Sequence, residues 1–182
     1  MKAINNLSVY FIGIGGSGMM PLALMAARCG YRVGGSDRKL DAGKRGALEK
    51  AGIVVHSPPD ANQIQDQDFV VYSSAIRRDH PEYVRASQCI DTTDMRLMHR
   101  MQFLNECLSR YNCQFAVAGT HGKTSTASML GWALLQLKLQ PGILVGGRPI
   151  YLPDGIHVGP GDCAVYETDE SDGSFLESRA RF

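Results

Sequence analysis

A short glycine loop past the middle of the chain carries the residues best suited to hold a phosphate chain. The loop reads Gly119-Thr-His-Gly-Lys-Thr124, in which Lys123 can reach terminal phosphate oxygens and the Thr124 hydroxyl can bind Mg²⁺. The usual phosphate loop has the form G-x-x-x-x-G-K-[ST], but Val117 occupies the position of its first glycine. This difference argues against an ordinary GTPase or motor ATPase. His121, inside the loop, could donate a hydrogen bond to a substrate anion or simply fill the turn.

An acidic stretch later in the chain could complete a metal site beside this loop. The residues ETDESDGSF, 167–175, follow an apolar run that we expect to be a strand of the same sheet. Mg²⁺ prefers oxygen ligands and usually takes only one or two protein carboxylates beside a bound phosphate. A carboxylate at the end of a neighbouring strand is well placed to supply one. The alternative is a solvated acidic loop that binds nothing.

A second glycine turn lies near the start of the chain. Gly13, Gly15 and Gly18 fit the pattern G-x-G-x-x-G, in which glycine permits a tight turn and lets the backbone approach a diphosphate. Asp37 follows Gly18 by 19 residues, where an acid in a dinucleotide-binding fold accepts hydrogen bonds from a ribose. The pattern indicates ligand binding rather than a turn that only packs a helix on a strand. A nicotinamide or flavin cofactor and a nucleoside-diphosphate sugar are both consistent with it.

Alternating strands and helices must position the first glycine turn. Apolar runs predict strands, helical periodicity predicts helices between them, and a short helix is expected after Pro81. The expected strands are residues 8–14, 31–37, 52–56, 68–75 and 88–91, and the expected helices are 17–28 and 42–51. Such alternation predicts a Rossmann-like α/β domain, a parallel sheet covered by helices on both faces.

The second half repeats the order of strand, glycine turn and helix. A longer helix is expected at 93–110, and 146–162 is expected to be loop because it holds five glycines and three prolines. The remaining expected elements are strands at 113–119, 142–147 and 162–170 and a helix at 124–137. We therefore predict two domains, a Rossmann-like domain at residues 1–110 and a second α/β domain of the P-loop type at 111–182.

Composition excludes several classes of function. The 182 residues include 19 basic and 18 acidic side chains, which gives a net charge of +1. The chain therefore lacks the excess of basic residues that would suggest a nucleic-acid or membrane partner. No apolar run reaches the ~18 residues of a membrane-spanning helix, and the N-terminus resembles a buried strand more than a signal peptide. Five scattered cysteines without a CxxC pair suit inert thiols in a reducing cytosol. These features predict a cytoplasmic protein.

Four motifs together resemble the Mur ligases of peptidoglycan synthesis. The motifs are FIGIGGSGMMPLA (11–23), VVYSSAI (70–76), AVAGTHGKTSTASM (116–129) and ETDESDGSFL (167–176). Within the family, GIGGSGM, GTHGKT and ETDESD are most similar to members that join L-alanine to UDP-N-acetylmuramate. A muropeptide-recycling branch is the alternative, but its first turn typically has a cysteine and a bulkier residue where this chain has Gly15 and Gly18.

The resemblance assigns roles to both glycine turns, one for the UDP-sugar and one for ATP. It implies that Thr124 and Glu167 bind Mg²⁺ and that Lys123, His121 and Glu167 take part in catalysis. His121 is expected to face the lactyl carboxylate of the sugar. The UDP-N-acetylmuramate-binding residues it implies are Gly13, Gly15, Gly16, Ser17, Gly18, Met19, Ser36, Asp37, Ser73, Ser74 and Ala75. The implied ATP-binding residues are Gly119, Thr120, His121, Gly122, Lys123, Thr124 and Ser125.

The chemistry that the resemblance implies is ATP-dependent amide ligation through an acyl phosphate. It also implies that residues 111–182 are the start of a P-loop-type ATPase domain. This central domain is larger than residues 113–182, carries a further metal-binding histidine and a carbamylated lysine, and is followed by a third domain. Because the chain ends at Phe182, we expect it to bind the UDP-sugar without completing ligation. The competing hypotheses are a nicotinamide-dependent oxidoreductase, a P-loop kinase for a small acceptor and a stand-alone UDP-sugar-binding module.

Overall fold

The computed structural model describes residues 6–168. The chain forms two compact units, which divide between Arg100 and Met101. This division lies earlier than the domain boundary expected after residue 110, which stays a prediction. Within the described range, no helix has both the length and the apolar character that crossing a membrane requires.

A five-stranded parallel sheet forms the centre of the first unit. Its strands are β1 (Ser8–Ile12), β2 (Arg32–Ser36), β3 (Val54–His56), β4 (Phe69–Tyr72) and β5 (Arg96–His99). They lie in the order β3-β2-β1-β4-β5, and every neighbouring pair is parallel. From β1 the chain first adds β2 and β3 on one side of the sheet and then β4 and β5 on the other. The connections after β1 and β4 therefore leave in opposite directions, which creates a crevice at the carboxyl ends of these strands, where such folds bind ligands. The expected Rossmann-like sheet is confirmed.

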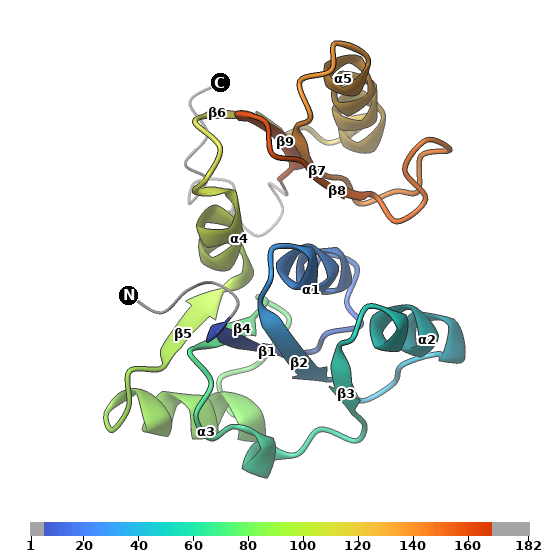
Figure 1. The fold of residues 1–182 in the computed structure, drawn as a ribbon. Helices are drawn as coiled ribbons and strands as arrows, with labels where there is room; N and C mark the ends of the chain where they lie inside the picture. Colours follow the sequence, from blue (N-terminus) through green and yellow to red (C-terminus); the bar gives the residue numbers. More distant parts are fainter. Residues whose placement is uncertain (1–5, 169–182) are drawn as a thin grey trace. The chain divides into compact units, whose positions relative to one another are not determined.

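Helices cover both faces of this sheet. The helices α1 (Met19–Arg28) and α2 (Ala42–Lys50) lie on one face, and α3 (Pro81–Ile90) lies on the other (Figure 1). A short 3-10 helix, η2 (Ala61–Gln63), precedes β4. Apolar side chains of β1, β4, α3 and the adjoining loops form a buried cluster: Tyr10, Ile12, Ile64, Val70, Tyr83, Ala86, Cys89 and Met95. This packing fixes the ends of the strands that carry the glycine turn.

Two sequence predictions at the end of the first unit are wrong. Residues 88–91 were expected to form a strand, but α3 continues to Ile90 and buries Cys89. The fifth strand instead lies inside the expected helix 93–110, and only Arg100–Leu108 is helical, as α4. A short apolar run is compatible with either a helix or a strand. Here the pairing with β4 makes the segment a strand, in a register that runs from Phe69 opposite Arg96 to Tyr72 opposite His99.

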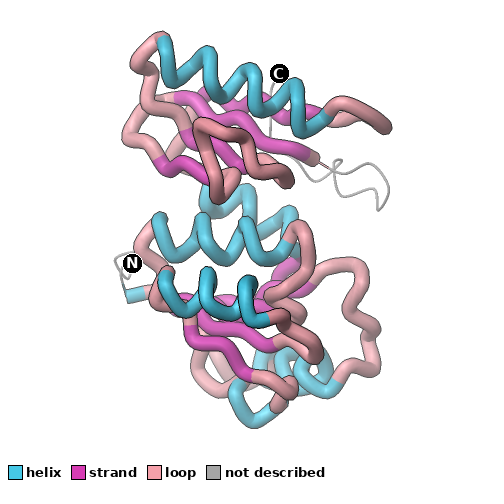
Figure 2. Tube along the Cα trace, turned by 90° about the vertical axis from the view of Figure 1, so that its right-hand side faces the viewer, coloured by secondary structure: helices cyan, strands magenta, loops and turns pink. Residues whose placement is uncertain are grey.

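The second unit contains a smaller mixed sheet. Its strands are β6 (Cys113–Val117), β7 (Gly142–Leu144), β8 (Ile156–Val158) and β9 (Cys163–Glu167), in the order β6-β9-β7-β8. The strands β6, β9 and β7 are parallel, whereas β8 is antiparallel to β7. The helix α5 (Lys123–Gln136) packs along this sheet, as both views show (Figures 1 and 2).

The order of these strands brings distant parts of the sequence together. Strand β9 lies between β6 and β7, although it follows both in the chain. Strand β8 lies within the expected loop 146–162, so the prediction of a loop is wrong there. A strand of three residues among glycines and prolines is too short to show the alternation of apolar and polar residues that would predict it. The expected acidic turn from Asp169 onward lies outside the described residues.

Candidate nucleotide-binding sites

The first glycine turn is hydrogen-bonded to the end of β2. The backbone amides of Gly13 and Ile14 each donate to the carbonyl oxygen of Ser36, both at 2.9 Å. The amide of Gly15 donates to the Asp37 carboxylate at 2.8 Å, and the Lys44 ammonium donates to the Gly15 carbonyl oxygen at 2.9 Å. The turn is therefore held in shape from two sides before any ligand arrives.

Gly15 has no room for a side chain. A Cβ there would lie 2.8 Å from the nearer Asp37 carboxylate oxygen and 2.5 Å from a methyl carbon of Leu40. Both distances are below normal van der Waals separation. Asp37 and the turn must approach this closely for the amide of Gly15 to reach the carboxylate, so the glycine and the acid at the end of β2 form one local structure.

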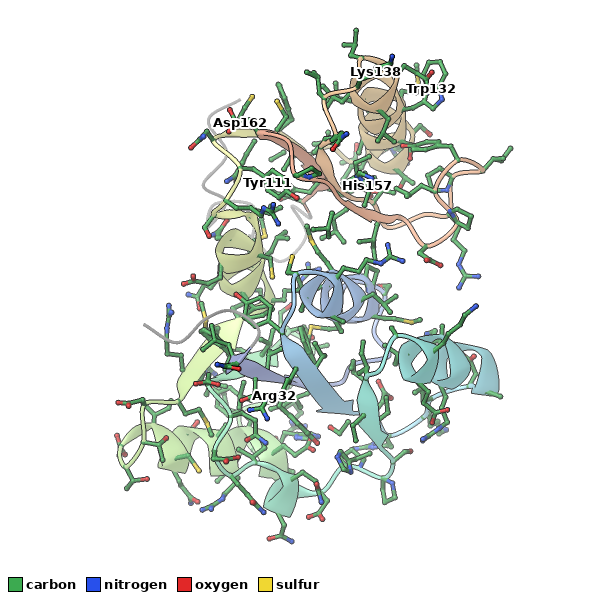
Figure 3. All side chains as sticks on the ribbon, viewed as in Figure 1. Arg32, Tyr111, Trp132, Lys138, His157 and Asp162 are labelled. Carbon is green, nitrogen blue, oxygen red and sulfur yellow. The ribbon has the colours of Figure 1, made fainter. Side chains whose placement is uncertain are left out.

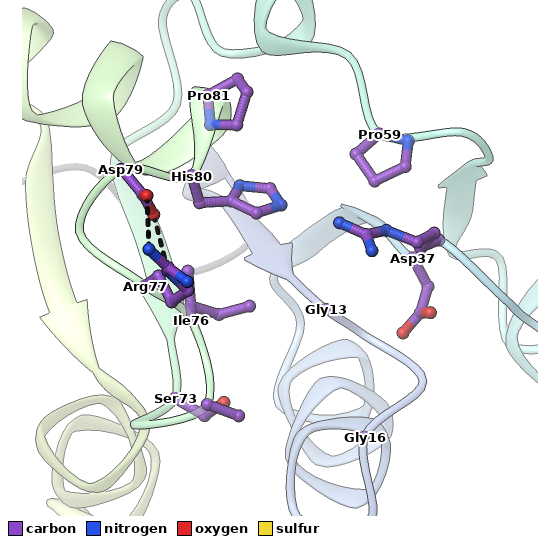
Figure 4. Close-up of a pocket in the computed structure, with 12 residues that line it drawn as sticks. Gly13, Gly16, Asp37, Pro59, Ser73, Ile76, Arg77, Asp79, His80 and Pro81 are labelled. Atoms are coloured by element: carbon purple, nitrogen blue, oxygen red, sulfur yellow. Dashed lines mark hydrogen bonds and ion pairs between the residues drawn. The ribbon is translucent and has the colours of Figure 1, made fainter.

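A pocket of about 640 Å³ opens beside this turn (Figure 4). A volume in this range accommodates a small-molecule ligand. Its walls come from the ends of β1, β2 and β4 and from the start of α3. The lining residues are Gly13, Gly16, Asp37, Arg38, Pro59, Ser73, Ala75, Ile76, Arg77, Asp79, His80 and Pro81.

Five of the residues expected to bind the UDP-sugar line this pocket together. They are Gly13, Gly16, Asp37, Ser73 and Ala75. The other expected residues do not contribute to its lining: Gly15, Ser17, Gly18, Met19, Ser36 and Ser74. Three segments that are distant in the sequence thus meet at one site, as expected at the carboxyl ends of β1 and β4.

A buried carboxylate behind the pocket was missed by sequence reasoning. Glu82 is 0% exposed and accepts hydrogen bonds from the Ser36 hydroxyl at 2.6 Å and from the Tyr10 hydroxyl at 2.8 Å. Ser36, expected near the uridine, is itself fully buried in this network. Burial raises the pKa of Tyr10 well above its ordinary value, so its hydroxyl remains a proton donor.

His80 connects this network to the pocket. Its ring projects into the pocket from the residue before α3 (Figure 4), and its Nδ1 lies 3.9 Å from a Glu82 carboxylate oxygen. The sequence signal was available, because His-Pro-Glu places proline at the first position of a helix and an acid in its first turn. Arg77 also lines the pocket and is paired with Asp79 at 2.8 and 3.1 Å.

The second glycine turn connects β6 to α5. Gly122 is the N-cap of the helix and has φ 78°, a left-handed conformation that favours glycine. Glycine offers no side chain to cap the first-turn amides, so these amides are well suited to bind an anion. The Lys123 ammonium folds back and donates to the Gly119 carbonyl oxygen at 2.7 Å. Thr120, His121 and Ser125 are exposed.

Thr124 and Glu167 meet at the end of two neighbouring strands. The ladder pairs Val117 with Glu167, which brings the end of β9 beside the start of the loop. The Thr124 hydroxyl donates to the Glu167 carboxylate at 2.9 Å, and the Gly146 amide donates to the other carboxylate oxygen at 2.6 Å. A hydroxyl and a carboxylate oxygen at one point are the type of donor that Mg²⁺ prefers, so these residues fit a magnesium ion.

Comparisons with known proteins identify similar sequences. Residues 8–112 match the Mur ligase family, catalytic domain. The chain is 41% identical over 172 residues to a UDP-N-acetylmuramate–L-alanine ligase from Desulforapulum autotrophicum, covering 94% of this chain and 36% of that protein. The chain therefore spans about a third of the length of the curated relatives it matches.

Two solved structures share the fold. A UDP-N-acetylmuramate-alanine ligase from Thermotoga maritima superposes with a TM-score of 0.82 at 34% identity, over 96% of this chain and 40% of that one. A UDP-N-acetylmuramate:L-alanyl-gamma-D-glutamyl-meso-diaminopimelate ligase from Neisseria meningitides gives 0.83 at 31% identity, over 96% and 58%.

Proposed function

Because this chain belongs to the Mur ligase family, we propose that it carries the UDP-sugar pocket and the ATP loop of an enzyme that joins L-alanine to UDP-N-acetylmuramate. The observation that carries this proposal is the presence of two different glycine turns in one chain. The first turn is hydrogen-bonded to Asp37 after β2, and the second ends in Lys123 and Thr124. A ligase that activates one nucleotide-linked substrate with another nucleotide needs both.

The pocket beside Asp37 is the site we propose for UDP-N-acetylmuramate. An Asp37 carboxylate oxygen can accept a hydrogen bond from a ribose hydroxyl, and the glycine turn at Gly16 lets a diphosphate approach the backbone. Ser73 can donate to the same ligand from the opposite wall. The pocket volume and the mixture of glycines, hydroxyl and charged side chains support a nucleoside diphosphate.

The loop from Gly119 to Ser125 is the site we propose for ATP. The first-turn amides of α5 can bind phosphate oxygens, and Lys123 can exchange its bond with the Gly119 carbonyl oxygen for one with a terminal phosphate. The Thr124 hydroxyl and the Glu167 carboxylate would hold Mg²⁺, which would neutralise charge on the phosphates when bound.

The proposed reaction forms an amide through an acyl phosphate. The lactyl carboxylate attacks the γ-phosphate and ADP leaves; the amino group of L-alanine then displaces phosphate. Two anions must approach each other in the first step. Lys123 and the loop amides lower this barrier because they stabilise charge on the transferred phosphoryl group. His121 is proposed to orient the lactyl carboxylate by a hydrogen bond. A reaction that consumes ATP and a UDP-sugar is proposed to take place in the cytoplasm.

Two alternatives are weaker. A nicotinamide-dependent oxidoreductase has no use for the lysine loop or the contact between Thr124 and Glu167. A muropeptide-recycling ligase shares the fold, but the curated relatives at about 40% identity are named as L-alanine ligases. These names support L-alanine as the amino acid.

Product analysis tests the proposal. The protein is incubated with ATP, Mg²⁺ and UDP-N-acetylmuramate, with L-alanine, with the recycled tripeptide or with neither, and ADP and nucleotide-linked products are measured. If residues 1–182 are not sufficient for turnover, the same assay is performed on a fusion that adds the remaining two thirds of a relative. Alanine-dependent ADP release supports the proposal. Tripeptide-dependent release, or ADP release that is the same with and without L-alanine, contradicts it.

A further inference from the structure

Two cysteines occupy opposite positions on neighbouring strands of the second unit. Cys113 begins β6, Cys163 begins β9, and the parallel register pairs them directly. Such partners point to the same face, and adjacent strands lie about 4.8 Å apart. Disulfides typically join Cα atoms about 4.4–6.8 Å apart. The backbone of this pair therefore already meets the spacing that a disulfide requires.

The two thiols also interact. Burial is the main cause that raises the pKa of the Cys163 thiol, and the neighbouring Cys113 side chain raises this pKa further. Both side chains are partly exposed, whereas Cys89 and Cys107 are buried. The pair thus combines mutual contact with access for a small reagent, which the buried cysteines lack.

The backbone around the pair is held in place. The Cys113 amide donates to the Asp162 carbonyl oxygen at 3.1 Å, and the Asn112 side-chain amide donates to the Asp162 carboxylate at 2.5 Å. Asp162 lies immediately before β9 (Figure 3). Closing a disulfide here needs side-chain rotation rather than movement of the strands.

We propose that Cys113 and Cys163 form a reversible modification site that closes to an intramolecular disulfide with a small-molecule disulfide such as oxidised glutathione. One cysteine thiolate attacks a glutathione sulfur, which gives a mixed disulfide and releases one glutathione thiolate. The second cysteine thiolate attacks the protein sulfur of that mixed disulfide and releases the second glutathione. The two protein thiols lose two electrons to glutathione disulfide, and their two protons pass to the released glutathione thiolates.

The position of the pair suggests what the bond does. It lies at the starts of β6 and β9, whereas the phosphate loop follows the opposite end of β6 and Glu167 is the last residue of β9. The disulfide would therefore crosslink the two strands that carry the ATP-side residues without touching those residues. We expect the oxidised form to melt at a temperature higher by roughly 5 °C or more. Burial raises the pKa of the Cys163 thiol, so closure should accelerate as the pH rises from 7 to 9.

Redox titration of the 182-residue chain tests this inference. The reduced protein is equilibrated with glutathione buffers of increasing oxidised fraction, quenched with an alkylating reagent, digested without reduction and analysed by mass spectrometry. Cys113→Ser and Cys163→Ser serve as the test variants and Cys29→Ala as the control, because Cys29 belongs to the other unit. Melting curves and Mg·ATP affinity are recorded for the reduced and oxidised wild-type protein.

The expected result is loss of two of the five thiols and a peptide that links Cys113 to Cys163, in the wild-type protein and in Cys29→Ala. Either serine variant should stop at a mixed disulfide with glutathione. The inference is overturned if five alkylated cysteines persist in oxidising buffer, or if the linked peptide joins another pair. Neither result depends on the ligand of the proposed function, so ATP affinity that is absent in both redox states would instead contradict that function.

Discussion

The hydroxyl of Thr124 donates to the carboxylate of Glu167 at 2.9 Å, although the two residues are 43 positions apart in the sequence. The strand order β6-β9-β7 creates this proximity, because β9 is inserted beside the strand that carries the loop. In phosphate-binding folds, oxygen ligands brought together at this point serve a metal ion beside the nucleotide. The contact is therefore the most specific feature of the proposed ATP site.

Loss of either partner should weaken magnesium-dependent nucleotide binding. Glu167→Gln keeps the size of the side chain but removes the charge, so we expect Mg·ATP affinity to fall by about tenfold or more. Affinity for ATP in the presence of a chelator should change less. Calorimetric titrations with and without Mg²⁺ measure both, with Asp154→Asn as a control for loss of one acid in the same unit. Equal loss in both conditions would contradict a metal role.

Lys123 should contribute to ATP binding through its charge. Its ammonium is bonded to the Gly119 carbonyl oxygen, a neutral partner that a phosphate oxygen can replace. Since hydrogen bonds to charged groups contribute about 1.5–3 kcal/mol, Lys123→Ala should reduce ATP affinity by about 10- to 100-fold. Lys138→Gln, beyond the end of α5, should leave the affinity unchanged. If both variants bind ATP equally well, the loop is not the nucleotide site.

Asp37 should determine binding in the first pocket. Asp37→Asn retains an oxygen for the Gly15 amide, but its NH₂ group then faces the Lys39 amide, which donates to Asp37 at 3.0 Å. We expect UDP affinity to fall by about tenfold because the ribose loses an acceptor and the turn loses its geometry. The exposed Asp66→Asn variant is the matched control. Unchanged affinity for UDP in Asp37→Asn would show that the Asp37 carboxylate does not contribute to UDP binding.

The buried pair of Tyr10 and Glu82 should make stability depend on pH in the alkaline range. Burial raises the pKa of Tyr10 in the folded protein above its unfolded value of about 10. The protonated hydroxyl therefore contributes its full stabilisation below pH 10, and this contribution is lost as the pH rises above 10, where the unfolded chain ionises first. Denaturant unfolding at several pH values should show a steeper alkaline decline for wild-type protein than for Tyr10→Phe. Parallel curves would show that the two states share one tyrosine pKa.

The sequence predicts the repeated units of this fold well because their signals are local. The strand before Gly13, the glycine turn and the acid ending β2 are contiguous patterns, and each lies where the pattern indicated. The errors involve elements that depend on partners far away in the chain. Strand β5 is apolar enough to suit a helix, and only its pairing with β4 makes it a strand. Strand β8 exists only because β7 offers it an antiparallel edge.

The same distinction applies to the candidate sites. Sequence motifs predicted Asp37 and the lysine loop as candidate sites, because each motif is defined by the spacing of residues along the sequence. The buried Glu82 network was missed, since Tyr10, Ser36 and Glu82 come from three separate elements. Likewise, no pattern in the sequence pairs Cys113 with Cys163; the register of β6 and β9 does.

Simultaneous binding of two nucleotides to one chain tests the central claim most directly. UDP-N-acetylmuramate is titrated into the protein by calorimetry in the absence and presence of saturating Mg·ATP, and NADH is titrated in parallel. We predict one site for the UDP-sugar that remains available when ATP is bound, no measurable NADH binding, selective loss of the UDP-sugar signal in Asp37→Asn and selective loss of ATP binding in Lys123→Ala. Competition of ATP and the UDP-sugar for a single site, or tight binding of NADH in place of the UDP-sugar, would contradict the account.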